Sequence, residues 1–503
     1  MVTTWDEQHD VVVVGSGAAA MAGAWQAATT GLDTVVLEKT SLLGGTSAYS
    51  GAACWLPGTE VQQRAGNADS TESARAYLRA LLGDEQLAKQ EAFLETAPRL
   101  VDAMEADPHL RFTWRPFPDY FDRSGRVPGG RSFVPDDLPA EELGELAALV
   151  RPIVDRDRLG KGHGAGPLTA GRALIGRLLL ALDRTGHGSV RTEHDVDELV
   201  TDDDGRVVGV VANTPSGRVR VRATRGVLLA AGGFERSHDV RATHDLPGSA
   251  DWSMAPAGSS TGDAARAAVA LGAATELMDQ AWWAPGVAAA GGGVSFAVGF
   301  RGGLVVDQHG RRYANESLPY DQLGRQMAAD PARVPSYALF DCRSGGQFPA
   351  YVVPGVDPDA QVAAGLWARA DTLEELAGQV GIPPEALAAT VARFNELAAS
   401  GHDADFGRGD DEFDRFFADP SLVPLDQPPY VAARLVLADL GTKGGLVTDV
   451  DSRVLREDGT TIDGLYAAGN TAASWTGPYY PGPGIPIGSG MVAASRAVDH
   501  LAG

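Results

Sequence analysis

Cysteines and long hydrophobic runs are scarce in this sequence. Only two cysteines, Cys54 and Cys342, occur among 503 residues, which excludes a disulfide framework and fits a reducing compartment. We expect both to be buried as small apolar residues. No stretch approaches the roughly 20 apolar residues of a membrane-spanning helix, and the polar segment Met1–Asp10 does not resemble a signal peptide. We therefore expect a cytoplasmic protein without a membrane span.

Positive charge is scarce as well. The 42 lysines and arginines stand against 66 aspartates and glutamates, which gives a formal net charge of −24. Such a surface repels phosphate backbones and anionic lipid headgroups, so we expect no nucleic-acid partner. Cysteines and histidines do not cluster with the spacing of a metal site, so no metal is expected either.

The chain starts with the pattern of an α/β nucleotide-binding fold. Apolar runs at Val11–Val14 and Val35–Leu37 flank an alanine-rich helical stretch. Residues 199–221 alternate apolar and polar side chains around two turn sequences, which predicts a β-meander. In a further predicted helix around residues 174–184, we expect Arg177 on the face turned away from the core.

The regular pattern changes near residue 280, where a glycine run and many prolines appear. Beyond them, Asp371 or Thr372 caps one predicted helix, and Pro383-Pro384 open another. The sequence therefore predicts the α/β class, with a Rossmann-like nucleotide-binding domain made of a parallel sheet plus a β-meander. An inserted α+β catalytic domain interrupts it. The predicted ranges are 1–279 and 441–503 for the nucleotide-binding domain and 280–440 for the insertion.

A dinucleotide fingerprint follows the first predicted strand directly. It reads Gly15-Ser16-Gly17-Ala18-Ala19-Ala20 and opens a helix. Gly15 permits the tight turn, and Gly17 lets a pyrophosphate approach the N–H groups at the start of the helix. Glu38, at the end of the second strand, is placed to accept hydrogen bonds from ribose hydroxyls.

Further glycine segments favour FAD over NAD. They are Gly44-Gly45-Thr46-Ser47 with Ser50-Gly51, Ala230 to Phe234, and Gly464 to Asn470. In this order they resemble the FAD-binding pattern of the fumarate reductase/succinate dehydrogenase flavoprotein superfamily over nearly the whole chain. The expected cofactor residues are Gly15, Ser16, Gly17, Ala18, Ala19, Glu38, Lys39, Gly44, Gly45, Thr46, Ser47, Ser50, Gly51, Val196, Ala231, Gly232, Gly233, Asp263, Gly469, Asn470, Ile485 and Ile487.

The resemblance also implies how the flavin is held. Superfamily members with covalent FAD attach it through a histidine near the segment that matches Gly44-Gly45 and Ser50-Gly51. This chain has no histidine there. We therefore expect non-covalent FAD.

The motifs that bind a dicarboxylate in fumarate reductases are altered here. Those enzymes carry a histidine before Thr-Met-Gly-Gly and an arginine shortly after an Asn-Glu pair. This chain reads Leu440 to Gly445 without a histidine, and Tyr320 stands after Asn315-Glu316 where the arginine would be. Because a dicarboxylate needs cationic partners, we expect a site without positive charge and a neutral substrate with a carbonyl group.

Four segments resemble the 3-ketosteroid Δ1-dehydrogenase family: residues 118–120, 315–320, 441–446 and 480–484. The resemblance implies 1,2-desaturation of a 3-ketosteroid or similar apolar ketone. Tyr480 and the Gly484 N–H would bind the C3 carbonyl, and Tyr320 and Tyr120 would act at the carbon that loses a proton. A quinone or another electron acceptor would reoxidise the flavin. The alternatives are a Δ4-(5α)-dehydrogenase, another enone-forming or enone-reducing flavoprotein, and a silent FAD-binding protein.

Desaturation beside a ketone requires a polarised carbonyl group and a base. The C2 proton becomes acidic only when the carbonyl is polarised, and each donor of a two-donor hole contributes about 2.7–4 kcal/mol by analogy with oxyanion holes. Tyr320 is expected to take the proton. Its free pKa of about 10 makes it a poor base, so we expect Tyr120 to stabilise its phenolate.

Three departures from the family pattern are the Tyr479-Tyr480 doublet, Pro486 and the charged segment 123–132.

Overall fold

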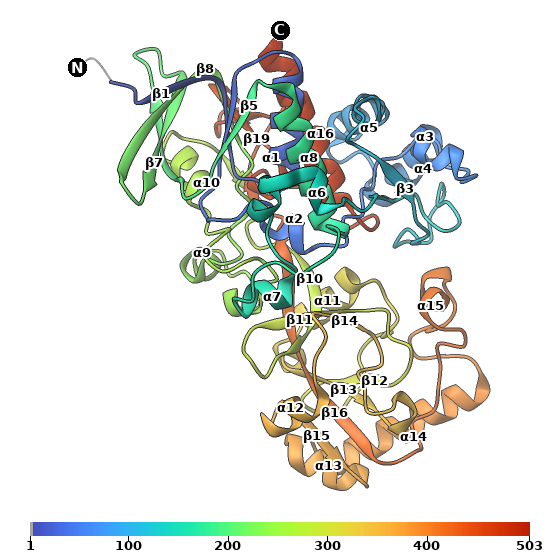
Figure 1. The fold of residues 1–503 in the computed structure, drawn as a ribbon. Coiled ribbons are helices and arrows are strands. Elements are labelled where there is room, and N and C mark those ends of the chain that lie inside the picture. Colours follow the sequence, from blue (N-terminus) through green and yellow to red (C-terminus); the bar gives the residue numbers. More distant parts are fainter. Residues whose placement is uncertain (1–3) are drawn as a thin grey trace. The chain divides into compact units, whose positions relative to one another are not determined.

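The short apolar runs of the sequence form the strands of a largely parallel β-sheet. In the computed structural model, which describes residues 4–503, its strand order is β18-β19-β8-β1-β2-β5 (Figure 1). The edge strand β18 is antiparallel to β19, and the other pairs in this order are parallel. The bounds are β1 Glu7–Val14, β2 Thr34–Leu37, β5 Gly188–Arg191, β8 Gly217–Leu229, β18 Arg453–Leu455 and β19 Thr461–Ala467. The predicted α/β class is confirmed.

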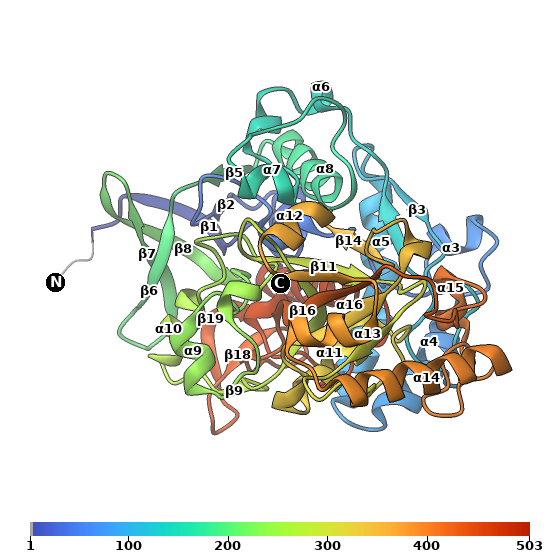
Figure 2. The same cartoon turned by 90° about the horizontal axis from the view of Figure 1, so that it is seen from below.

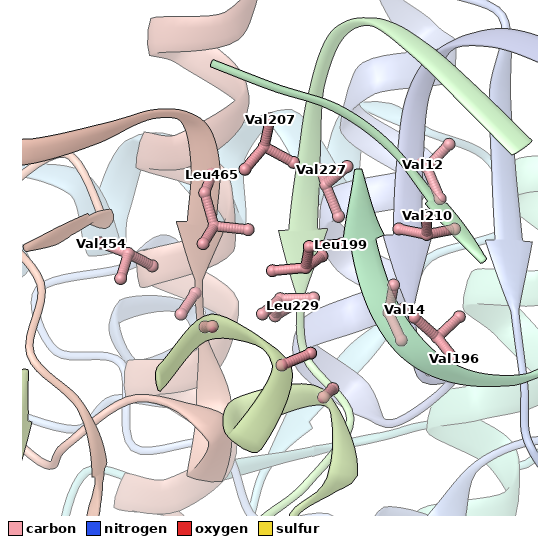
Figure 3. Packing of buried hydrophobic residues seen from close by; sticks show 14 of the residues in the cluster. Val12, Val14, Val196, Leu199, Val207, Val210, Val227, Leu229, Val454 and Leu465 are labelled. Carbon is pink, nitrogen blue, oxygen red and sulfur yellow. The ribbon is translucent and has the colours of Figure 1, made fainter. Parts of the chain in front are cut away.

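The predicted meander is confirmed as well. Strands β6 (Asp195–Thr201) and β7 (Val207–Thr214) pair antiparallel, and β7 continues onto β8 in the same way (Figure 2). Residues of the meander and of the parallel sheet share one apolar core (Figure 3). Val12, Val14 and Val227 contribute from the sheet, and Val196 and Leu199 from the meander.

Three long helices lie side by side in this part of the chain: α1 (Ala18–Thr29), α8 (Ala170–Thr185) and α16 (Ile485–Ala502) (Figure 1). Small residues let them pack closely, since a Cβ on Gly23 would come within 3.1 Å of the Ala494 Cβ. The prediction that Arg177 faces away from the core is wrong. Its guanidinium is buried and donates to the carbonyls of His109, Asp136 and Asp137, because a distant segment covers that face of α8.

The unit that contains the parallel sheet has further helices, single turns and short strands. They are α2 (Gly45–Tyr49), α3 (Glu60–Arg64), α4 (Thr71–Leu82), α5 (Leu87–Ala106), β3 (Phe112–Trp114), β4 (Phe133–Pro135), α6 (Ala140–Leu143), η1 (Gly144–Leu149), α7 (Val154–Arg158), α9 (His238–Thr243), α10 (Asp263–Val269), β9 (Thr275–Glu276), β17 (Gly445–Leu446) and η5 (Gly469–Thr471).

A second, seven-stranded sheet occupies the middle of the sequence, with the order β12-β13-β16-β10-β11-β14 and β15 paired to β16. Helices α13 and α14 bury their apolar faces on it through Leu376, Leu387 and Phe394. Thr372 caps the first of these helices, as expected from the sequence. The bounds are η2 Ala250–Trp252, β10 Ala281–Ala288, β11 Val294–Val298, β12 Leu304–Val306, α11 Tyr320–Ala328, η3 Pro331–Arg333, β13 Ser336–Phe340, η4 Cys342–Ser344, β14 Tyr351–Val353, α12 Pro358–Ala363, β15 Trp367–Ala370, α13 Leu373–Val380, α14 Pro384–Ser400, α15 Glu412–Phe417 and β16 Tyr430–Thr442.

The chain forms two compact units. The first contains the residues up to His244, Ala255–Ala281 and Gly441–Gly503, and the second contains Asp245–Met254 and Trp282–Leu440. The division into two functional domains stays a prediction. No helix within residues 4–503 is both long and apolar enough to cross a membrane. The segment Met1–Asp10, which we expect not to be a signal peptide, lies partly outside the described residues.

The two cysteines differ in exposure. Cys54 is buried as expected, but the prediction is wrong for Cys342, which is exposed. Cys342 opens the one-turn helix η4, which Asp341 caps at the surface. Both thiols are free.

Candidate functional site

The carboxyl ends of neighbouring parallel strands bring the predicted cofactor segments to one edge of the first sheet. Gly15 follows β1, Glu38 follows β2, Ala231 follows β8 shortly after its end, and Gly469 comes shortly after β19. Ligands of open α/β sheets bind at such an edge. Segments far apart in sequence meet here, since a Cβ on Gly469 would lie 3.3 Å from that of Ala19.

The fingerprint turn requires glycine for a definite reason. Gly15 has a φ of +102°, and a Cβ there would lie 2.3 Å from the Ala230 carbonyl oxygen. Gly17 is the N-cap of α1 and offers no side-chain cap. The Ser47 Oγ accepts from the Ala18 N–H at 3.1 Å. The helix thus begins with backbone donors near Ser47, which suits a pyrophosphate.

Glu38 is buried at the centre of a hydrogen-bond chain. One of its carboxylate oxygens accepts from the Ser16 hydroxyl at 2.5 Å. The other accepts from the N–H and the hydroxyl of Thr40, both at 2.8 Å. The Ser16 oxygen in turn accepts from the Gly44 N–H at 2.9 Å. A carboxylate has about four acceptor positions, so Glu38 retains capacity for a ribose hydroxyl. Thr40 was not identified from the sequence.

Lys39 and Asp263 pair with each other. The Lys39 Nζ lies 2.7 Å from the Asp263 carboxylate, 3.0 Å from the Thr261 hydroxyl and 3.4 Å from the Asp195 carboxylate. Burial alone would lower the pKa of Lys39, but its hydrogen bond to Asp263 and the charges of both aspartates raise it. The Val196 side chain packs into the apolar core, so its backbone is the part left for a ligand.

The segment from Gly44 to Gly51 is shaped by close approaches and open positions. Gly44 has a φ of +109°, and Gly45, Thr46 and Ser47 begin helix α2. The Ser50 hydroxyl donates to the Ser47 carbonyl at 2.7 Å. At Gly51, by contrast, a Cβ would meet no protein atom within 4 Å, and φ is not left-handed. Neither packing nor backbone strain requires glycine there, which fits a position against which a cofactor lies.

The glycines after β8 pack against the residues 441–446. A Cβ on Gly233 would lie 1.9 Å from the Thr442 Oγ1, and one on Gly441 would lie 2.2 Å from the Asn470 Nδ2. The Thr471 hydroxyl donates to the Gly232 carbonyl at 2.8 Å. The structure therefore joins three predicted segments, around Ala231–Gly233, Gly441 and Gly469-Asn470, through atoms too close for larger residues.

Lys443 places one buried positive charge near Tyr480, while the expectation of a substrate site without positive charge stays a prediction. The side chain of Lys443 is buried, and its Nζ donates to the carbonyls of Pro478 at 2.8 Å and Tyr479 at 3.0 Å. The ammonium group thus holds the backbone just before Tyr480. The sequence contains Lys443 within a matching motif, but the spacing gives no signal of these two acceptors.

The loop from Tyr480 to Gly484 lies against Tyr120. The Tyr120 N–H donates to the Pro481 carbonyl at 3.0 Å, and the rings of Tyr120 and Tyr480 are 5.2 Å apart between centroids. Both tyrosines are buried, whereas Tyr479 is 37% exposed. The structure thus brings together two residues that the sequence assigned to catalysis, and it favours the second tyrosine of the doublet.

Gly484 is the N-cap of the long helix α16. The first turn of this helix contains the predicted flavin contacts Ile485 and Ile487. Gly484 has a φ of +95°, and a Cβ there would lie 2.2 Å from the Ala53 carbonyl oxygen. Pro486 falls in the first turn of the helix, where a missing N–H breaks no helical hydrogen bond. This departure from the family pattern is therefore compatible with a regular helix.

Tyr320 belongs to the second unit, where it is the first residue of helix α11. It is buried, and the Phe296 ring meets it edge-on with centroids 4.8 Å apart. Its catalytic assignment stays a prediction.

A buried ionic network fixes the chain just before Tyr320. Glu316 accepts from Arg312 at 2.8 Å and from Arg408 at 3.0 Å. Although burial alone would raise the pKa of Glu316, the charge of Arg312, with that of Arg408, lowers it. The sequence motif contained Glu316 but gave no sign of its partner Arg408, which lies far along the chain.

Comparisons with known proteins agree with this arrangement. The model of the family described as FAD binding domain matches residues 10–487. A 3-oxosteroid 1-dehydrogenase of Rhodococcus opacus is 41% identical over 510 residues, which cover 99% of each chain. This chain belongs to the FAD-binding family of flavoproteins. FAD is its cofactor.

Solved structures of flavoproteins are similar over the whole chain. A 3-ketosteroid Δ1-dehydrogenase from Sterolibacterium denitrificans, in complex with 1,4-androstadiene-3,17-dione, matches with a TM-score of 0.90 and 33% identity over 99% of each chain. A 3-ketosteroid Δ4-(5α)-dehydrogenase from Rhodococcus jostii matches with a TM-score of 0.67 and 26% identity, over 100% of this chain and 98% of that one. The family resemblance inferred from the sequence is confirmed. The individual contacts to FAD remain predictions.

The attachment of the flavin can be tested by acid precipitation. We expect the yellow protein to release all its flavin into the supernatant, because the chain has no histidine between His9 and His109. The absorbance of the supernatant near 450 nm gives the released fraction. Flavin that stays with the washed pellet would show a covalent bond and contradict the prediction.

Proposed function

We propose that this flavoprotein catalyses the 1,2-desaturation of 3-ketosteroids, as an oxidoreductase acting on a CH–CH group. The observation that carries the proposal is the buried pairing of Tyr120 with the Tyr480–Gly484 loop. These are the residues that the Δ1-dehydrogenase family uses on the substrate. The identity of 41% to a 3-oxosteroid 1-dehydrogenase supports the same conclusion. The higher TM-score to the Δ1-dehydrogenase favours it over the Δ4-(5α) alternative.

The carbonyl-binding group consists of two neutral donors. The Tyr480 hydroxyl and the Gly484 N–H donate to the C3 oxygen, which gains negative charge as the enolate forms. Preorganised donors of this kind stabilise the developing charge more than the ketone. Gly484 also caps the N-terminus of α16, and the helix dipole adds a partial positive charge there.

Proton removal falls to the other tyrosines. Tyr320 takes the C2 proton onto its phenolate oxygen, and Tyr120 assists at the same carbon. FAD, when bound, supplies the hydride acceptor. The fingerprint residues 15–19, Glu38, and the glycine segments that meet at the sheet edge would hold the FAD.

Two further parts of the proposal concern the surroundings of the enzyme. A quinone or another electron acceptor reoxidises the flavin. The protein acts in the cytoplasm, which the two free thiols support because free cysteines suit a reducing compartment.

The substrate class follows from the neutral donors and can be tested anaerobically. We expect 4-androstene-3,17-dione to bleach the flavin band within the time of a turnover and to yield the 1,4-diene. Fumarate, and a cyclohexanone bearing a carboxylate, should turn over at least 100-fold more slowly, since neither Tyr480 nor Gly484 offers a charge to a carboxylate.

Product analysis by mass and retention time separates the alternatives. Formation of a 4-ene from a 5α-3-ketosteroid, without a 1-ene, would indicate the Δ4-(5α) reaction. Comparable turnover of fumarate would contradict the assigned substrate class, and absence of bleaching by every ketone would indicate a silent FAD-binding protein.

A further inference from the structure

A buried cluster lies behind the Tyr480–Gly484 loop in the first unit. We call it the clamp; its members are Trp55, Asp69, Tyr77, Asp119 and Arg131. We propose that the clamp is a positioning device that fixes the carbonyl-binding loop and Tyr120 relative to each other. This inference rests on the proposed function, because it assigns a purpose to residues that the proposed function does not place at the substrate.

The centre of the clamp is a fully buried arginine between two carboxylates. The Arg131 Nε donates to Asp119 at 3.0 Å, and its Nη1 lies 3.1 Å from Asp69. The side chains of all three are 0% exposed. The guanidinium also stacks over the rings of Trp55, at 5.1 Å, and Tyr77, at 5.4 Å. The positive charge of Arg131 therefore lies between two carboxylates and two aromatic rings.

The stability of the fold alone does not explain a buried arginine between two carboxylates. Removing charges from water is costly, and apolar residues of similar volume often give equal or greater stability. In some proteins such buried groups instead impose one geometry on their neighbours. Arg131 binds Asp119, which directly precedes Tyr120. The two rings beside its guanidinium belong to Trp55 and Tyr77, and both of these residues donate to carbonyls of the Tyr480–Gly484 loop.

The clamp reaches the loop through hydrogen bonds and a close approach. The Trp55 Nε1–H donates to Asp119 at 2.8 Å. The loop lies directly on this bond, because a Cβ on Gly482 would come 2.5 Å from the Trp55 Nε1 and 2.8 Å from the Asp119 Oδ1. Glycine is therefore the residue that fits at this point of the loop.

Tyr77 holds the same loop from a second direction. Its hydroxyl donates to the Pro481 carbonyl at 2.6 Å and accepts from the Phe121 N–H at 3.2 Å. The Pro481 carbonyl also accepts from the Tyr120 N–H. Burial raises the pKa of Tyr77, so this hydroxyl stays protonated and acts as a donor rather than as a base.

The loop needs such external support because of its own sequence. Pro481 and Pro483 have no N–H to donate, and their carbonyls accept hydrogen bonds from groups of other segments. The Ser132 hydroxyl donates to the Pro483 carbonyl, next to Arg131 in the chain. Asp119 binds Trp55 and Arg131 with its two oxygens and immediately precedes Tyr120. One set of contacts therefore sets the position of both tyrosines.

A displaced donor loses transition-state stabilisation before it loses ketone binding, and an error of about 1 Å can lower the rate by about 100-fold. The test uses Tyr77→Phe in the FAD-loaded enzyme, because this change removes one hydroxyl and keeps the ring. We expect kcat for 4-androstene-3,17-dione to fall roughly 10- to 100-fold, with KM and FAD content within about twofold of wild type.

Binding of a steroid with a phenolic A ring, which mimics the enolate, gives the readout that a purely structural role would not change. We expect its Kd in Tyr77→Phe to rise in proportion to the loss in kcat, while the Kd of the dienone product changes little. The matched control is Tyr337→Phe, whose hydroxyl also donates to a backbone carbonyl, that of Val380, but in the second unit. This control should retain wild-type values.

The outcomes separate the two proposals. If wild type does not desaturate the steroid, the proposed function is wrong and the clamp loses its purpose with it. If wild type is active and Tyr77→Phe keeps kcat and the phenol-to-ketone affinity ratio, the clamp proposal is wrong. If Tyr77→Phe fails to retain FAD, Ser132→Ala takes its place, since it removes the donor to Pro483. An unchanged ratio in that variant would equally overturn the proposal.

Discussion

Tyr320→Phe is expected to lower the turnover of 4-androstene-3,17-dione by about 100- to 10,000-fold, the usual contribution of a general base. The variant removes the proposed proton acceptor and preserves the aromatic ring that packs against Phe296. FAD content should remain that of wild type, because Tyr320 is not assigned to the cofactor. Steady-state rates with an artificial acceptor give kcat, and flavin spectral shifts give the steroid Kd, which should change little.

Hydrogen–deuterium exchange at C2 isolates the proton step from the redox step. With the flavin kept reduced, wild type should exchange the C2 protons of the ketone in deuterated buffer, and Tyr320→Phe should not. Tyr337→Phe serves as the control for loss of a tyrosine hydroxyl in the same unit. Exchange at the wild-type rate in Tyr320→Phe would show that another group is the base, with Tyr120 the next candidate.

The sequence was most informative where function and fold depend on local chain geometry. The turn after β1 needs a left-handed residue in contact with Ala230, and Gly15 meets that need within its own motif. The parallel strands were visible as short apolar runs because both faces of the sheet are covered. The order of the strands places Glu38 and Gly469 at one edge of the sheet. The sequence could therefore predict that the segments assigned to the cofactor lie close together.

The partners of buried charges could not be predicted in the same way. Periodicity shows which side of a helix is apolar, but not which distant segment covers the other side. Arg177 illustrates this, because backbone carbonyls of residues 109–137 bury it. Arg131 lies in the charged segment 123–132, yet it is fully buried between Asp69 and Asp119.

Tertiary contacts also changed the meaning of residues inside recognised motifs. Lys443 stands where fumarate reductases have methionine, and the motif alone suggested a site without cations. Its two carbonyl acceptors lie 35 and 36 residues further along the chain. A separation of this length along the chain gives no periodic pattern. Whether Lys443 meets these carbonyls depends on how the intervening chain folds back. The motif that contains Lys443 was therefore visible in the sequence, whereas the carbonyl groups that Lys443 binds were not.

Tyr480→Phe is expected to lower kcat by about 100- to 1,000-fold, the usual cost of one lost oxyanion donor. The hydroxyl contributes little to the neutral ketone and much once the C3 oxygen carries charge. The variant should therefore bind the dienone product nearly as well as wild type and bind a phenolic A-ring steroid far more weakly. FAD should stay bound, since the side chain is not assigned to the cofactor. Titrations of the flavin spectrum give both dissociation constants.

Tyr479→Phe is the matched control for this prediction, because it removes the same hydroxyl one residue earlier in the doublet. Tyr479 is 37% exposed and contacts the Phe121 ring, whereas Tyr480 is buried against Tyr120. We expect Tyr479→Phe to keep wild-type turnover and affinity for the phenolic steroid. If the losses appeared in Tyr479→Phe and not in Tyr480→Phe, the carbonyl donor would be the first tyrosine. C2 exchange with reduced flavin should also slow in Tyr480→Phe, since the proton leaves only as the carbonyl oxygen gains stabilised charge.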